Sequence, residues 1–417
     1  MSYFATLLYI ILIFIRPQDW TEALEGVPIL DYMAVLAVGT CFLEGNVNLA
    51  KWKRSPLNWL ILVFWLTLIL SQATNFYPAG VLEALEKFSK VLIVYYLIVF
   101  TVDTVPKLRM FTWLLIFMSL FLAISAVIQY YTGVGLAGAE ALQRGGVTQA
   151  RGVGIFADPN DLALNLVPTV AFLLPSFHRV ALSNTWVTGF LALMPIITGI
   201  IYTRSRGGIM GLAAVAWMYM RKRVGLVLSV VGLLLLGALL LAIPRMDEIN
   251  TGESSARSRL EHWSYGLELF RAHPLFGAGY NSFTEDYPQT AHNSFVLVLA
   301  EAGILGAAAW VALFVAGFRH LFLLSRLDRA PPWLQPYVDS LQAALVGWLV
   351  CAFFLSQTYK FLSFVLLAMV VASMNALARQ GVEVHHPWTS RQLLYSGAGA
   401  VIGVLFMYAA LKVLWAM

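Results

Sequence analysis

Charged residues are scarce in this sequence of 417 residues, since Asp, Glu, Lys and Arg together make up 12% of it. Soluble globular domains carry about 25% of these residues. Hydrophobic residues account for 60% of the chain, and its mean hydropathy is +0.76. This composition excludes a soluble protein and predicts one that is embedded in a membrane.

Cysteine is also scarce, with Cys41 and Cys351 both falling inside apolar runs. A disulfide framework and a cysteine metal site are therefore not expected. Asp158 and Asp161 form an acidic pair without clustered histidines or further acids, which favours helix capping over a metal site. No Walker loop, dinucleotide fingerprint or nucleophile elbow appears in a supporting context, so we expect neither a metal nor a cofactor.

Apolar runs of about 15 to 23 residues recur along the whole chain, and this length crosses a hydrocarbon core of about 30 Å. They predict an all-α, polytopic membrane protein in which residues 1–417 form a single domain of about 12 or 13 transmembrane helices. Residues 3–15 lack a basic n-region and a cleavage site, so we interpret them as a span rather than a signal peptide. Residues 81–90 carry four charges and are alternatively an interfacial segment. The expected spans are residues 3–15, 29–44, 57–71, 81–102, 109–130, 159–176, 185–203, 207–220, 224–243, 292–318, 338–357, 361–378 and 393–415.

Basic residues fall on alternate connections between these spans, and the positive-inside rule places such connections in the cytoplasm. The N-terminus is then cytoplasmic, and the connections at 131–158, 203–207 and 244–291 face the periplasm or the cell exterior. The same clusters account for the net charge of +5, so we do not expect nucleic-acid binding. The cytoplasmic cations include Lys51, Lys53, Arg54, Lys107, Arg109, Arg179, Arg221, Lys222, Arg223, Arg319, Arg326, Arg329, Arg379 and Arg391.

The outward connections carry arginines that the same rule disfavours. Arginine stays charged at a membrane surface and holds phosphate oxygens in a bidentate fork. The cluster therefore indicates an anionic, phosphorylated ligand on the outer face, with anchoring to lipid headgroups as the alternative. These arginines are Arg144, Arg151, Arg204, Arg206, Arg245, Arg257, Arg259 and Arg271.

The long connection at 244–291 contains a predicted amphipathic helix. Ser258-Arg-Leu-Glu261 has the form of a capping box, and apolar residues recur at helical spacing until Pro274. With Ser258 as N-cap, Arg259 stands at the first helical position, where unpaired amides favour an anion. The short turn from Thr203 to Gly208 places two further arginines where spans emerge.

A histidine opens the span that follows this connection. With Thr290 as N-cap, His292 lies in the first helical turn, where the helix dipole keeps an imidazole neutral, as a general base requires. A capping or interfacial histidine is the alternative. Glu301 lies about 13 Å deeper on the opposite helix face, so a structural role suits it better than pairing with His292. At another span start, Asp158 is the expected N-cap and Pro159 the first helical residue.

The order of these motifs resembles the O-antigen ligase and Wzy polymerase superfamily, whose matching motifs lie between residues 156 and 306. The stretches that carry the resemblance are Phe156-Ala-Asp-Pro-Asn-Asp-Leu-Ala163, Thr203-Arg-Ser-Arg-Gly-Gly208, Arg259-x-x-x-Trp263, His273-Pro-Leu-Phe-Gly-Ala-Gly-Tyr-Asn-Ser-Phe283 and His292-Asn-Ser-Phe-Val-Leu-Val-Leu-Ala-Glu-Ala-Gly-Ile-Leu-Gly306. The resemblance implies a glycosyltransferase of the GT-C type in the bacterial inner membrane, moving a glycan from undecaprenyl pyrophosphate at the periplasmic face.

The resemblance also implies roles for single residues. Arg206 and Arg259 match the arginines that hold the pyrophosphate and offset the charge on the leaving group, without a metal. His292 matches the histidine that takes the proton from the acceptor hydroxyl as it attacks the anomeric carbon from the opposite face. Arg204 is an extra cation relative to the family motif, so either it or Arg206 is the phosphate contact. The expected substrate-binding residues are Arg204, Arg257, Asn160, Tyr280 and Asn293.

The acceptor is left open by these residues. A ligase transfers the glycan to lipid A core sugar, a polymerase to another carrier-linked glycan, and a related branch to protein. A transporter or flippase for a polyisoprenoid-linked glycan is the alternative from another class. Against transport, the polar residues gather at one face, whereas transporter sites lie near the membrane midplane.

Overall fold

The computed structural model describes residues 1–144, 146–175, 184–225, 227–232, 252–285, 287, 289–382, 384, 391, 395, 397–399 and 401–403. Most of the span expected at 393–415 and much of the one expected at 224–243 lie outside these residues, although residues 227–232 are helical. The described chain is 75% helical with nearly no strands, which confirms the all-α prediction.

The helices follow the predicted spans closely, with ends that shift by a few residues. In chain order they are α1 (Ser2–Ile15), α2 (Ile29–Leu43), α3 (Leu49–Lys53), α4 (Leu57–Thr74), α5 (Pro78–Thr101), α6 (Val105–Thr132), α7 (Pro159–Leu173), α8 (Asn184–Tyr202), α9 (Arg206–Val224), α11 (Gly252–Ala272), α12 (Ser294–Leu324), α13 (Leu334–Phe353) and α14 (Phe361–Ala378). Single-turn 3₁₀ helices lie at Pro17–Asp19, Glu22–Leu24 and Gly154–Phe156.

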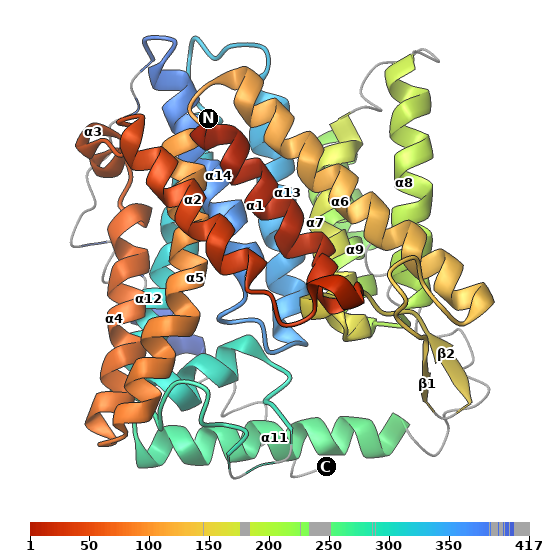
Figure 1. Cartoon of the computed structure of the whole chain (residues 1–417), viewed down its shortest axis with the longest axis vertical. Coiled ribbons are helices and arrows are strands. Elements are labelled where there is room, and N and C mark those ends of the chain that lie inside the picture. Colours follow the sequence, from red (N-terminus) through yellow and green to blue (C-terminus); the bar gives the residue numbers. More distant parts are fainter. Residues whose placement is uncertain are drawn as a thin grey trace.

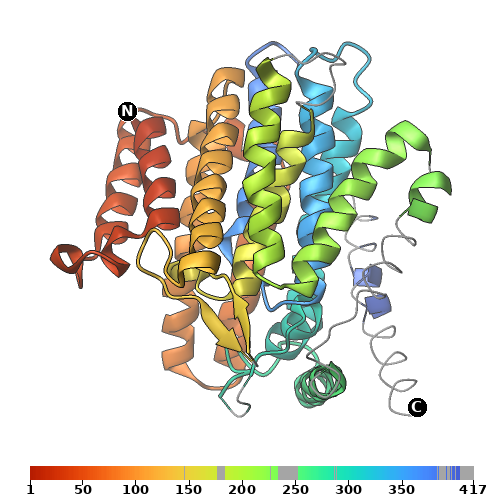
Figure 2. The same ribbon diagram turned by 90° about the vertical axis from the view of Figure 1, so that its right-hand side faces the viewer.

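Most of these helices stand side by side as a bundle, and α11 lies across one end of it (Figures 1 and 2). Within the described chain, α4, α6, α12, α13 and α14 are long and apolar enough to cross a membrane, and shorter apolar helices occupy Ile29–Leu43 and Val187–Tyr202. The protein is therefore a multi-pass membrane protein. Of these helices α14 is the most deeply buried, with every residue from Leu362 to Leu377 inside the bundle.

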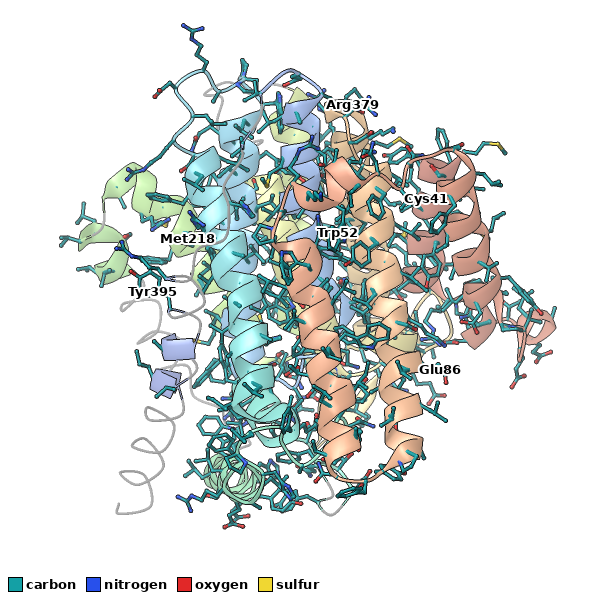
Figure 3. The ribbon with its side chains drawn as sticks, turned by 90° about the vertical axis from the view of Figure 1, so that its left-hand side faces the viewer. Cys41, Trp52, Glu86, Met218, Arg379 and Tyr395 are labelled. Atoms are coloured by element: carbon teal, nitrogen blue, oxygen red, sulfur yellow. The ribbon has the colours of Figure 1, made fainter. Side chains whose placement is uncertain are left out.

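The end of the bundle opposite to α11 is held by a buried carboxylate. Asp103, which is 1% exposed, accepts hydrogen bonds from Lys51 Nζ at 2.9 Å, Lys107 Nζ at 2.8 Å and Arg379 Nη2 at 2.8 Å. Figure 3 labels Arg379 at this end. The three cations come from three connections that the charge pattern places on one side, so the predicted grouping of these connections is confirmed.

Residues 81–90 continue the span expected at 81–102, and one further element was not expected. Residues 81–90 are part of the continuous helix α5, where Lys87 pairs with Glu83, and Lys90 lies 3.4 Å from Glu86 and 3.5 Å from Asp31. Charge pairing along one turn explains why this polar stretch stays helical. The connection after α6 contains a hairpin of two short strands, β1 (Leu142–Arg144) and β2 (Val147–Gln149), which the sequence did not predict.

Candidate active site

The first turn of α9 is fixed by a serine cap. The side chain of Ser205 accepts the amide N–H of Gly208 at 3.2 Å and donates to Asn160 Oδ1 at 2.7 Å. Arg206 is the first residue of α9, directly after this buried cap. The start of α9 therefore carries a cation at the positive end of the helix dipole, an arrangement that favours an anion.

The start of α7 lies next to this cap, as the hydrogen bond to Asn160 requires. Asp158 is the N-cap and accepts the amide N–H of Asn160 at 2.8 Å, while Pro159 is the first helical residue. Both predictions are confirmed. Asp161 accepts a hydrogen bond from Gln357 and lies 4.0 Å from Lys360 Nζ. Both partners belong to the connection before α14, so this carboxylate holds the start of α7 against that connection.

Arg204, one of the two candidate phosphate contacts, makes a hydrogen bond within the protein. Its backbone is left-handed, with φ 56°, and its Nη2 donates to the hydroxyl of Tyr130 at 3.3 Å. Tyr130 stacks on Tyr202 with ring centroids 4.0 Å apart, and the hydroxyls of Tyr131 and Tyr202 are 2.6 Å apart. The sequence analysis missed this tyrosine cluster, although Tyr130 and Tyr131 stand together at the end of a span.

Helix α11 begins earlier than predicted. It starts at Gly252, so Ser258 is inside the helix rather than at its N-cap, and the expected first-turn position of Arg259 is wrong. Ser258 instead lies one turn before His262, with Oγ 3.4 Å from Nε2. Free helix amides therefore cannot assist Arg259, and its side chain alone supplies the charge.

The apolar face of α11 packs against the connection and the helix α12 that follow it, and against the end of α13. Trp263 contacts Phe353 edge to face at 5.7 Å, and Tyr265 stacks on Tyr287 at 4.8 Å. Gly266 lies so close to Val296 that a Cβ there would come within 2.4 Å of its side chain. The predicted amphipathic helix is confirmed, and this packing fixes the position of Arg259 and His262 along the bundle end.

Arg259 of α11 and Arg206 of α9 lie within range of each other's charge. Burial lowers the pKa of the half-buried Arg259, and the positive charge of Arg206 lowers it further. Among the described residues no carboxylate pairs with Arg259. Two guanidinium groups that repel one another in a partly buried place are stabilised by an anion between them.

His292 lies beside α11, the helix that carries Arg259, but it is not in the first turn of a helix. The N-cap of α12 is Asn293, whose Oδ1 accepts the amide N–H of Phe295 at 2.9 Å and of Val296 at 3.2 Å. The prediction that Thr290 is the cap is therefore wrong, because the helix starts later. His292 precedes the cap with φ 47°, a left-handed conformation that is uncommon outside glycine and costs free energy.

A second histidine, which the sequence analysis missed, stands beside His292. The ring centroid of His262 is 5.6 Å from that of His292, and its ring meets Tyr287 edge to face at 5.1 Å. Its residue is 3% exposed. The sequence signal was present, since His262 lies one helical turn after Arg259 and next to Trp263.

The connection between α11 and α12 is hydrogen-bonded to the backbone of α12 at a point where that helix is interrupted. Gly303 has φ 63° and ψ −166°, which interrupts the helix and frees its backbone groups. Ile304 N donates to Pro274 O at 2.9 Å, and Ala278 N donates to Ala300 O at 2.8 Å. Glu301, which is 2% exposed, accepts the amide N–H of Phe283 at 3.0 Å, so the structural role preferred for it is supported.

Tyr280 belongs to this buried connection. It is 6% exposed, its amide donates to Ser71 Oγ at 3.0 Å, and its carbonyl accepts from Gln72 Nε2 at 2.6 Å. Its ring packs on Tyr359 at 4.8 Å. These contacts give Tyr280 a place in the packing of the connection against α4, and they leave its predicted contact with substrate without structural support.

Of the remaining outer arginines, the structure describes the side chains of Arg151 and Arg271. Arg151 donates from Nε to Glu140 O at 2.7 Å, and Arg271 is exposed in the last turn of α11. Arg245 and the side chains of Arg144 and Arg257 lie outside the described residues. Among the residues that are described, no group of three His, Cys, Asp or Glu side chains is placed to hold a metal.

Comparison with known families gives one match. Residues 191–311 match the family model Wzy_C, described as O-antigen ligase. The matched region runs from α8 into α12 and includes Arg206, Arg259, His262 and His292, whereas Asn160 lies before it. No curated protein matches the chain. The match confirms the resemblance that the sequence motifs indicate.

Proposed function

We propose that this multi-pass membrane protein of the O-antigen ligase and Wzy superfamily transfers a glycan from undecaprenyl pyrophosphate to an acceptor hydroxyl at the periplasmic face of the bacterial inner membrane. The family match supports a ligase or polymerase type of enzyme. The donor, the acceptor and the residue roles are our proposal, and lipid A core sugar is the acceptor that we favour.

The electrostatic interaction between Arg206 and Arg259 carries this proposal. The two residues come from α9 and α11, and the charge of the first lowers the pKa of the second. A pyrophosphate bound between them has two phosphate groups, so each guanidinium can hold oxygen atoms in a bidentate fork. The amides at the start of α9 add to the same positive field.

In the proposed reaction the acceptor oxygen forms a bond to the anomeric carbon while the bond from that carbon to the pyrophosphate oxygen breaks. Negative charge grows on the leaving pyrophosphate, and Arg206 and Arg259 stabilise it without a metal. His292 takes the proton of the acceptor hydroxyl. Attack from the face opposite to the leaving group inverts the configuration at the anomeric carbon, in a GT-C-like enzyme.

The alternative transfer reactions use the same donor and differ in the acceptor whose hydroxyl His292 would deprotonate. A second carrier-linked glycan would make the protein a polymerase, and a protein acceptor would make it an O-oligosaccharyltransferase. The alternative from another functional class is that the protein transports a polyisoprenoid-linked glycan. The gathering of Arg206, Arg259 and His292 at the bundle end that carries α11 favours transfer, because a transport path needs polar groups near the midplane.

The test is a transfer assay with purified protein. The protein is incubated with an undecaprenyl-pyrophosphate-linked glycan and, separately, with lipid A core, a second carrier-linked glycan or a protein acceptor. Arg206→Ala and Arg259→Ala should each lower transfer by about 10²- to 10³-fold, and lysine should rescue only partly. Arg271→Ala, an exposed arginine of the same helix α11, is the matched control and should transfer normally.

The acceptor that becomes glycosylated identifies the branch of the superfamily. Near-normal transfer by Arg206→Ala or Arg259→Ala, at matched protein levels, would remove that residue from the pyrophosphate site. Movement of the carrier-linked glycan across vesicle membranes, with no glycosylated product from any acceptor, would replace the transferase with a transporter.

A further inference from the structure

His262 is almost completely enclosed, yet one of its nitrogens has no partner within the described structure. The residue is 3% exposed, and its Nε2 lies 3.4 Å from Ser258 Oγ on the preceding turn of α11. Its Nδ1 makes no hydrogen bond to any described residue. A buried polar atom is normally paired, because leaving it unpaired loses more than the bond itself contributes net.

The surroundings of His262 are mixed in charge and contain the proposed base. On its own helix it adjoins Arg259 and Glu261, and from the following connection Tyr287 and His292 face it. Burial lowers the pKa of His262, with Glu261 raising it and Arg259 lowering it. A neutral imidazole is favoured here, and a neutral ring offers one donor and one acceptor rather than a charge.

The two imidazoles lie close enough together to contact neighbouring groups of one sugar. Their ring centroids are 5.6 Å apart and their planes are tilted by 39°, so the rings lie beside one another and are not stacked. Adjacent hydroxyls of a sugar ring are close enough for each imidazole to contact one of them. A partner for Nδ1 of His262 would then arrive with the same sugar that brings its reacting hydroxyl to His292.

We propose that His262 binds the acceptor sugar, with its Nδ1 hydrogen-bonded to the hydroxyl next to the one that His292 deprotonates. The inference rests on the proposed glycan transfer and deepens it, because it makes the preferred acceptor a sugar with two neighbouring hydroxyls. His262 transfers no proton in this role. It orients the acceptor, so that the attacking oxygen faces the anomeric carbon.

Three substitutions of His262 separate the roles of its two nitrogens and its ring. His262→Asn keeps a polar group near the position of Nδ1, His262→Gln keeps one near the position of Nε2, and His262→Phe keeps only the ring that packs on Tyr287. Ser258→Ala is the matched control, since it removes only the contact to Nε2. Each is assayed with the acceptor that the wild-type protein uses.

The expected result is a loss of about tenfold in kcat/KM for His262→Phe and His262→Gln, the usual effect of one lost hydrogen bond, expressed in the acceptor KM. His262→Asn should retain most of the activity, and Ser258→Ala should be close to wild type. The donor KM and the pH profile should not change, because Arg206, Arg259 and His292 remain.

Other outcomes would overturn the assignment. A His262→Phe protein with the wild-type acceptor KM would show that the ring only packs, and this variant keeps the ring contacts that fold the site. If all three variants were equally inactive and the acidic limb of the pH profile disappeared, His262 would act as a base and the orienting role would be excluded. If the wild-type protein glycosylates no acceptor, the proposed function itself fails and this inference fails with it.

Discussion

The hydroxyl of Ser205 donates to Asn160 Oδ1 at 2.7 Å while it accepts the amide of Gly208 at 3.2 Å. Ser205 caps α9 and Asn160 is in the first turn of α7, so one hydroxyl joins the starts of two helices. Arg206 follows the cap directly. We therefore expect the position of Arg206 to depend on α7, whose residues lie outside the matched family region.

Breaking this link should move Arg206 without removing it. Ser205→Ala removes the cap and the bond to Asn160, and we expect it to lower the free energy of unfolding by about 1 to 2 kcal/mol and to weaken transfer. Ser205→Thr retains a capping hydroxyl and should preserve both. Measurements of thermal unfolding in detergent and of transfer rate would check this, and wild-type behaviour of Ser205→Ala would contradict the link.

Asn160→Asp offers a complementary test. It keeps an oxygen that accepts from Ser205, so the fold should be retained. It also adds a negative charge at the start of α9, which should compete with a phosphate for Arg206 and raise the donor KM. An Asn160→Asp protein with an unchanged donor KM would place the phosphate away from this end of α9.

The elements that the sequence predicted correctly depend on signals within a few residues. Asp158 followed by Pro159 specifies a helix start, because the cap and the fixed backbone angle act locally. The spans follow in the same way from run length. The charge pattern correctly grouped the connections of Lys51, Lys107 and Arg379 at one end, since each must avoid the hydrocarbon core.

The elements that the sequence did not predict are decided by contacts between distant segments. Ser258 and Thr290 both fit a capping pattern. However, α11 already begins at Gly252, and the N-cap of α12 is Asn293. His262 looks like an ordinary polar residue of an amphipathic helix until the connection after α11 places His292 beside it. Its role could be inferred only from that pairing.

Gly303 should be indispensable for the break in α12. Its φ of 63° with ψ −166° is reached readily by glycine alone, and a Cβ at this position would lie 2.4 Å from Leu275 O. We therefore expect Gly303→Ala to lower the unfolding temperature strongly and to displace the connection that ends at His292. Gly39→Ala is the matched control, because a Cβ there meets nothing within 4 Å. Similar unfolding temperatures for both variants would contradict the strain at Gly303.

The orientation of the bundle in the membrane is a further prediction. The positive-inside rule places α11 outside and residues 221–223 inside. A cysteine introduced at Gly252 should react with a membrane-impermeant thiol reagent added to intact cells whose outer membrane has been permeabilised, and a cysteine at Arg221 should not. The native Cys41 and Cys351 are buried, so background labelling should be low. Labelling of Gly252→Cys from the cytoplasmic side alone would reverse the orientation and exclude a periplasmic site.

His292 is expected to be the group that takes the proton from the acceptor. It stands just before the cap of α12 in a left-handed conformation, beside the helix that carries Arg259. His292→Gln should still bind the donor but lose about 10²- to 10⁴-fold in transfer rate, the usual contribution of positioned proton transfer. His292→Asn is the sharper control for the backbone, because asparagine tolerates the left-handed region and lacks a usable base.

Transfer rate against pH separates a base from a structural histidine. If the imidazole must accept a proton, the wild-type rate falls on acidification as His292 becomes charged, and this limb disappears in His292→Gln. If His292 only holds the turn before Asn293, His292→Asn should turn over almost normally per folded molecule, since it keeps the left-handed backbone. A fully active His292→Gln protein with an unchanged pH profile would remove the base assignment. The proton would then have to leave through water or through a carboxylate at the start of α7, Asp158 or Asp161.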